Sequence, residues 1–251
     1  MLALKLLLVP AFLALISLAG RRWGPGVAGR LAGLPALTGP ILFLLALEKG
    51  PGFAAAAATV SLSAVFGAVV YVVTYARLCV RRPPGFAFLG GLASWCCAAL
   101  LLTSLPLIPV ASLIIALSAL AIAPSLFPRA PAPLSPARLP RLELPLRMLA
   151  GALLTLAVTS LAAFIGPSWS GMFAVFPVLA IVLSVFSHRN SGPAFALILL
   201  RGMILGLYAF TSFCLALAAL LPSQGVAIAF VSATAVAIAV QWAVMSLRPG
   251  R

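Results

Sequence analysis

Long uninterrupted apolar runs are the feature that most restricts how this 251-residue chain can fold. Runs of about 20 apolar residues recur from end to end, and each is long enough to cross a bilayer as an α-helix. Only 7% of the residues are charged, against about a quarter in soluble domains. The runs are continuous rather than alternating, which argues against barrel strands. The sequence therefore predicts an all-α polytopic membrane protein.

The chain also matches itself when it is shifted by 142 positions, with no gap. The matches involve glycine and proline, whose special backbone demands give a coincidence more weight than a match of leucine or alanine. They are Gly24-Pro25 with Gly166-Pro167, Ala28-Gly29 with Ser170-Gly171, Pro35 with Pro177, and Gly50-Pro51 with Gly192-Pro193. Self-similarity at one offset predicts a duplicated core.

The apolar runs predict about nine transmembrane helices, which form two inverted four-helix repeats joined by a linker helix. An odd number of spans separates equivalent positions, so the two copies face opposite sides of the membrane, a plan typical of transporters. The predicted parts are a first repeat (1–105), a linker helix (106–127), a Pro/Arg-rich loop (128–147) and a second repeat (148–251). The predicted helices are Leu2–Gly20, Val27–Leu47, Phe53–Leu78, Phe86–Thr103, Leu107–Leu126, Met148–Ile165, Gly171–Phe186, Pro193–Leu220 and Val226–Met245.

Positive charge is distributed unevenly over the loops of this arrangement. The chain has 16 lysines and arginines against two acidic residues. Nine spans place every arginine except Arg201 on one face, with Lys5 and Lys49 on the other. The positive-inside rule then predicts a cytoplasmic C-terminus and an N-terminus outside. The basic loop fits anionic lipid headgroups better than nucleic acid, and its alternative role is to dock a protein partner.

Both halves carry a short motif in which a small residue and glycine precede Leu-Pro or Phe-Pro. It is Ala28-Gly29 with Leu34-Pro35 in the first half, and Ser170-Gly171 with Phe176-Pro177 in the second. With Glu48-Lys49-Gly50 and the spacing of Gly90 and Trp95, this motif resembles the GlpM-like family of small bacterial inner-membrane proteins. The second half departs from it, because His188-Arg189-Asn190 lacks the acidic residue and Ala237 replaces the tryptophan.

The resemblance covers most of each half but not the linker helix or the basic loop. It implies a multi-pass protein of the bacterial inner membrane, in a family tied to glycerol and alginate phenotypes. In that family the four-helix unit stands alone, so this chain would be a fused tandem version.

Arg201 is the strongest candidate for a solute-binding residue. It lies about eight residues into its predicted helix, roughly 12 Å deep, where a charge usually faces protein or water. It could contact an anion in a cavity, bond carbonyls freed by the broken helices, or snorkel to the cytoplasmic surface.

Pro35 and Pro177 interrupt helices at equivalent positions. They either create discontinuous helices whose backbone lines a site or merely kink the helices for packing. Thr59, at the repeat position of Arg201, could add a hydroxyl to a central cavity. Small residues are predicted to let helices approach closely; these are Gly24, Ala28, Gly29, Gly166, Ser170 and Gly171.

These features favour a transporter or permease for an anionic or lipid-linked solute. The alternative is a non-transporting scaffold or accessory factor for an envelope, polysaccharide or glycerol-related process. An enzyme is not expected, because one histidine and two glutamates offer no acid/base pair. The four cysteines and the single histidine show no metal-binding spacing, so neither a metal nor another cofactor is predicted.

Overall fold

The computed structural model describes residues 2–104, 109–129, 142–165 and 176–247. All regular structure in these ranges is helical, and eight of the helical segments are long and apolar enough to cross a membrane. Large apolar side chains are exposed around the molecule, among them Leu7, Leu89 and Val231. Such an apolar exterior suits a hydrocarbon environment rather than water. The chain is an all-α polytopic membrane protein, as the sequence predicts.

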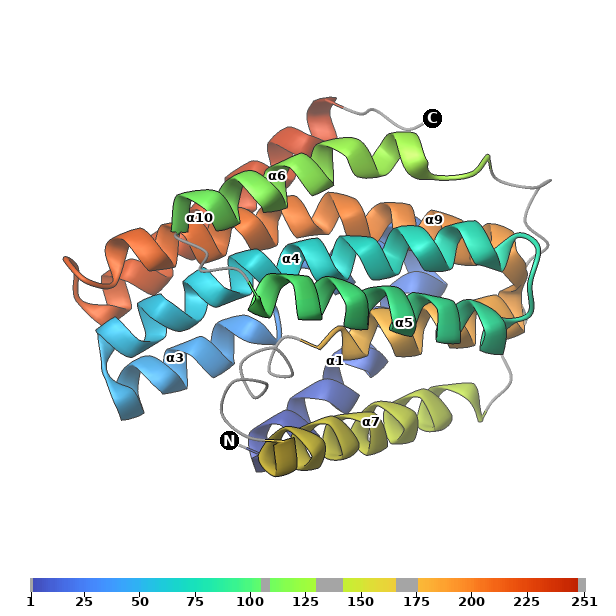
Figure 1. Cartoon of the computed structure of the whole chain (residues 1–251), viewed down its shortest axis with the longest axis horizontal. Helices are drawn as coiled ribbons and strands as arrows, with labels where there is room; N and C mark the ends of the chain where they lie inside the picture. The colour runs from blue at the N-terminus through green and yellow to red at the C-terminus, as the bar shows by residue number, and fades with distance from the viewer. Residues whose placement is uncertain (1, 105–108, 130–141, 166–175, 248–251) are drawn as a thin grey trace.

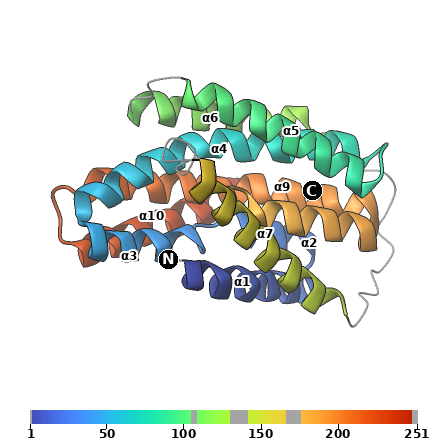
Figure 2. The same cartoon turned by 60° about the horizontal axis from the view of Figure 1, so that its bottom comes forward.

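The structure contains nine labelled helical segments in the described residues. They are α1 (Leu2–Trp23), α2 (Pro25–Gly33), α3 (Thr38–Lys49), α4 (Pro51–Cys79), α5 (Pro84–Thr103), α6 (Pro109–Leu126), α7 (Glu143–Ile165), α9 (Val178–Leu220) and α10 (Val226–Leu247). Figure 2 shows α5 and α6 on one side of α4, and α1 and α7 on the opposite side of the molecule.

Glycine and proline set several of these boundaries. Gly24 (φ 88°), Gly50 (φ 90°) and Gly192 (φ 82°) have positive φ angles, and a proline follows each of them. Glycine adopts this backbone region at little cost, and proline then suits the first turn of the next helix. The helix expected over Val27–Leu47 is divided into α2 and α3, because Leu34 is extended (φ −71°, ψ 159°) just before Pro35.

Helix α9 is divided at Gly192. Its 43 residues would extend about 65 Å as a straight helix, about twice the thickness of the hydrocarbon core. Figure 1 shows the chain turning back at this point. The first arm is 178–191 and the second arm is 193–220. The predicted boundary between Phe186 and Pro193 is close to this turn, and the predicted start at Gly171 lies outside the described residues.

Helix α7 begins earlier than the sequence suggests. The loop was predicted to run through Arg147, but residues 143–147 are helical. Proline is tolerated in the first helical turn, where its missing N–H would have no partner in any case. Pro145 therefore does not prevent helix formation, and Glu143 favours it by placing a negative charge at the helix N-terminus.

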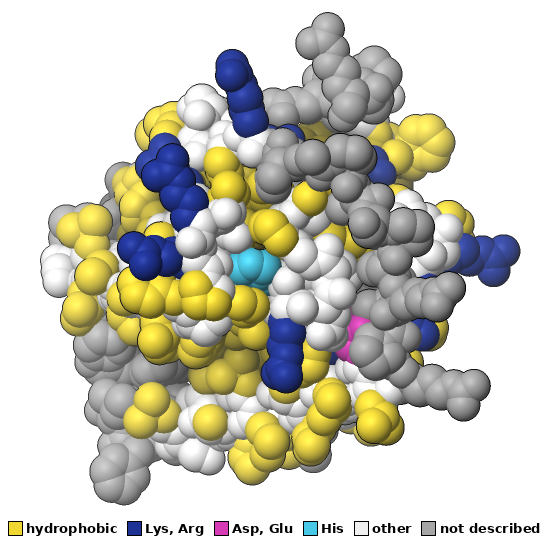
Figure 3. Space-filling view, turned by 90° about the vertical axis from the view of Figure 1, so that its right-hand side faces the viewer, with side chains coloured by type: hydrophobic (Ala, Val, Ile, Leu, Met, Phe, Trp, Pro, Cys, Tyr) yellow, Lys and Arg dark blue, Asp and Glu magenta, His cyan; other side chains and the backbone are white. Residues whose placement is uncertain are grey.

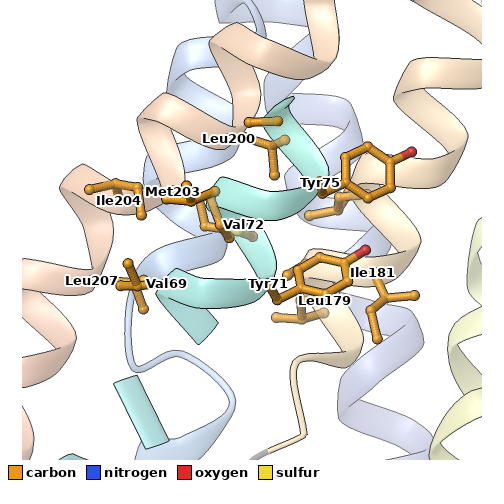
Figure 4. Close-up of a cluster of buried hydrophobic side chains, with 14 of the residues drawn as sticks. Val69, Tyr71, Val72, Tyr75, Leu179, Ile181, Leu200, Met203, Ile204 and Leu207 are labelled. Carbon is orange, nitrogen blue, oxygen red and sulfur yellow. The ribbon is translucent and has the colours of Figure 1, made fainter. Parts of the chain in front are cut away.

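The core forms where α4 lies against both arms of α9. Figure 4 shows Tyr71 and Tyr75 beside the first arm, near Leu179 and Ile181. Val69 and Val72 lie against the second arm. In a bilayer, such packing is held by van der Waals contact and hydrogen bonds rather than by exclusion of water.

Candidate functional site

The α2–α3 connection and the start of α9 meet around a small cavity of about 110 Å³. One wall comes from the α2–α3 connection and the start of α3, including Leu34 and Thr38. The opposite wall is the start of the first arm of α9, from Phe176 to Ala180. Helix α4 and the second arm of α9 supply the remaining walls. The α2–α3 connection and the start of α9 therefore contribute to one central cavity.

The cavity lining follows the sequence repeat. Twelve of its residues form six pairs, each separated by 142 positions. The pairs are Leu34 and Phe176, Leu37 and Leu179, Thr38 and Ala180, Ser61 and Met203, Val65 and Leu207, and Ala68 and Phe210. Equivalent parts of the two halves thus face the same space.

The cavity wall is mostly apolar. Its polar side chains are Thr38 and Ser61, and the Ser61 hydroxyl donates to the carbonyl of Ala57 at 2.9 Å. The N-terminal ends of α3 and of α9 also adjoin the cavity, at Thr38 and Val178. Helix N-termini carry partial positive charge, which favours a negative group nearby.

The structure brings one of the four predicted binding residues to this cavity, which is Pro177. Pro35 instead lines an apolar groove of about 720 Å³ between the α2–α3 connection and α10. The Thr59 hydroxyl donates to the carbonyl of Ala55 in its own helix at 3.1 Å. Arg201 is exposed, donates to the carbonyl of Pro128 at 2.7 Å and does not line this cavity.

Only some of the residues that were expected to allow close helix packing lie at such a contact. Gly29 touches α9 so closely that a Cβ atom would overlap the carbonyl of Leu199. Ala28 is buried, whereas Gly24 has open space around it and serves the turn into α2. The other three, Gly166, Ser170 and Gly171, lie outside the described residues.

A buried ion pair that the sequence did not reveal lies at the arginine-rich end. Arg147 and Glu143 on α7 are 4% and 2% exposed and pair across one helical turn. Arg147 also donates to the hydroxyls of Ser17 on α1 at 3.2 Å and of Ser187 on α9 at 3.4 Å. The i,i+4 spacing of Glu143 and Arg147 was the available signal, but it lies in a segment that was assigned to the loop.

A series of polar side chains continues from the central cavity toward this ion pair. The Tyr71 hydroxyl lies 3.0 Å from the Ser184 hydroxyl, and the Tyr75 hydroxyl lies 3.3 Å from Nδ1 of His188. All four side chains lie on α4 or on the first arm of α9: Tyr71 is next to Val72 of the cavity wall, and Tyr75, Ser184 and His188 follow Val72 or Ala180 of that wall. Figure 3 looks onto this end of the molecule, where basic side chains gather.

Within the described part of the chain, no three His, Cys, Asp or Glu side chains lie together in a way that could hold a metal ion. His188 is buried and faces Tyr75 rather than an acidic group. No match was found among protein-family models, curated proteins or solved structures.

Proposed function

We propose that the chain is a membrane transporter of the permease type, which moves a small anionic solute through the central cavity. The observation that carries this proposal is the cavity lining itself, in which six residue pairs from the two halves face one another across the site. Transporters built from internal repeats bind their substrates at the repeat interface, between interrupted helices.

An inverted repeat is part of the proposal. Gly50 and Gly192 are 142 positions apart and share a rare backbone conformation, with ψ angles of 162° and 174°. Five predicted spans separate them, so the second copy would be upside down relative to the first. In this proposal the chain is a fused pair of four-helix units of the GlpM-like type in the bacterial inner membrane.

An anionic solute fits the charges of the molecule. The formal net charge is +14, and the two helix N-termini beside the cavity favour a negative group. The basic side chains gathered at one end would attract anions and anionic lipid headgroups there, and would mark the cytoplasmic side. The cavity volume favours a small oxyanion over a drug-sized ligand, because sites for such ligands span about 300–1,000 Å³.

Flux measurements test the proposal directly. The purified protein is reconstituted into liposomes, and entry of radiolabelled formate and inorganic phosphate is compared with entry into empty liposomes. Ala68→Trp introduces a large ring at the cavity wall and is expected to reduce flux by at least about tenfold, the effect of roughly 1.4 kcal/mol in a barrier. Ala121→Trp, on the exposed face of α6, is the matched control and should leave flux unchanged.

Equal flux through the wild type and a folded Ala68→Trp variant would exclude this cavity as the route. Wild-type flux no greater than that of empty liposomes, for both anions, would instead favour the scaffold or accessory role.

A further inference from the structure

Two basic side chains occupy equivalent positions in the repeat, at opposite ends of the α1–α7 pair. Lys5 on α1 and Arg147 on α7 are 142 positions apart, and so are Ser17 on α1 and Thr159 on α7. Arg147 donates to Ser17, while Lys5 and Thr159 line one small cavity of about 40 Å³. Each end of this helix pair therefore places a cation and a hydroxyl together, one from each helix.

The Lys5 cavity adjoins the central cavity. Leu37, Phe176 and Val178 line both of them, so no more than a shared wall of side chains separates the two spaces. A solute at Lys5 would therefore be next to the proposed transport site. At the other end, Tyr71, Ser184, Tyr75 and His188 extend from the central cavity toward Arg147.

The two cations differ in their partners. Arg147 is paired with Glu143 inside the protein. The repeat position of Glu143 is Met1, so the Lys5 end carries no equivalent carboxylate. The Arg147 end is thus occupied by an acidic side chain of the chain itself, whereas the Lys5 end keeps an open cavity.

Some polar atoms of the Arg147–Glu143 pair also lack hydrogen-bond partners. Arg147 Nε and Glu143 Oε2 are buried without a hydrogen-bond partner, although buried polar atoms usually have one. The exposed Arg21, near the end of α1, adds positive charge to the surroundings of this pair. An oxyanion could accept from both Nε and an Nη of Arg147, the paired geometry that guanidinium favours.

We infer that Arg147 is an anion-binding site at the arginine-rich end, which Glu143 occupies in this conformation, and that Lys5 is its counterpart at the other end. The ligand is a small oxyanion, carboxylate or phosphate, and it competes with the Glu143 carboxylate for the guanidinium. Glu143 thereby keeps this end closed until an anion displaces it. The role in transport rests on the proposed function, but anion binding at Arg147 does not.

Binding is tested separately from transport. Thermal unfolding of the detergent-solubilised full chain is followed with added formate or inorganic phosphate, and with chloride at equal ionic strength. Glu143→Gln removes the carboxylate that competes for Arg147, so a larger fraction of the protein has an Arg147 side chain free to bind an anion. The half-saturating concentration of formate or phosphate should therefore fall on the order of tenfold. Arg147→Gln, alone or combined with Glu143→Gln, should abolish the response.

Matched controls are available in the same chain. Glu48→Gln makes the same chemical change at an exposed position, and Arg201→Gln removes an exposed arginine. Both should respond to the anions as the wild type does. If Glu143→Gln does not fold, Glu143→Asp keeps the charge on a shorter side chain and should give a smaller shift in the same direction.

The outcomes separate the two proposals. The proposed site is wrong if formate or phosphate stabilises the Glu143→Gln variant against thermal unfolding no more than chloride does. It is also wrong if this stabilisation persists in the variant that combines Glu143→Gln with Arg147→Gln. A response that requires Arg147, in a protein without flux, would preserve the site and refute the transport function.

Discussion

At the scale of single residues, one contact between α4 and α9 differs in polarity from its equivalent in the repeat. The Tyr71 hydroxyl lies 3.0 Å from the Ser184 hydroxyl. The repeat equivalents of these residues are Phe213 and Leu42, which belong to one apolar cluster. Of these two equivalent contacts between the halves, the one that leads toward Arg147 is therefore polar, which fits a role for it at the arginine-rich end.

The strength of this contact can be measured with a double-mutant cycle. Tyr71→Phe and Ser184→Ala should show a coupling energy of about 0.6 kcal/mol, the average for side-chain hydrogen bonds between membrane helices. Unfolding is followed in mixed micelles as denaturing detergent is added. A second cycle of Tyr71→Phe with Thr234→Ala, whose hydroxyl bonds within α10, should show coupling near zero. Similar values in both cycles would mean that the Tyr71–Ser184 contact contributes no specific stability.

At the scale of helices, the closest approach is that of α2 to the second arm of α9. A Cβ atom on Gly33 would overlap the carbonyl of Met203 and the Cα atom of Gly206. Backbone atoms on both sides cannot move away as a flexible side chain could. Small residues allow this approach, and the contact holds the end of α2 beside the central cavity.

Gly33→Ala should therefore destabilise the protein by about 1–3 kcal/mol, the usual effect of overpacking. Gly85→Ala is the control, because Gly85 on α5 has open space around its position. The control should be neutral or stabilising by up to about 1 kcal/mol. Both variants are compared in the same detergent-unfolding experiment, and equal stability of the two would contradict the close packing of α2 on α9.

Helix boundaries were easier to predict than helix partners. Gly50 and Pro51, like Gly192 and Pro193, marked turns correctly because their backbone preferences are local. Pro35 likewise signalled the interruption between α2 and α3. The Arg147 site was missed, because neither the proline-rich composition before it nor the spacing of Glu143 shows that Ser17 and Ser187 approach from other helices. Such contacts depend on tertiary packing, which local sequence does not encode.

At the scale of the whole molecule, an inverted repeat predicts on which side of the membrane each loop lies, which the cavity alone does not. Residues 142 positions apart must lie on opposite sides of the membrane if one copy is upside down. Arg81, after α4, and Ser223, after α9, are such a pair, and both are exposed. Arg189, by contrast, should lie on the same side as Arg81, because the turn at Gly192 is at the arginine-rich end.

Cysteine labelling in intact cells distinguishes these arrangements. The exposed Cys96 and Cys97 must first be replaced, together with the buried Cys79 and Cys214, so that no native thiol reacts. In that background, Arg81→Cys and Arg189→Cys should be protected from a membrane-impermeant maleimide until the cells are opened. Ser223→Cys and Lys49→Cys should react from outside, because the arginine-rich end is expected to be cytoplasmic. Labelling of Arg81→Cys and Ser223→Cys from the same side would mean parallel copies, and the cavity could then not lie on a two-fold axis in the membrane plane.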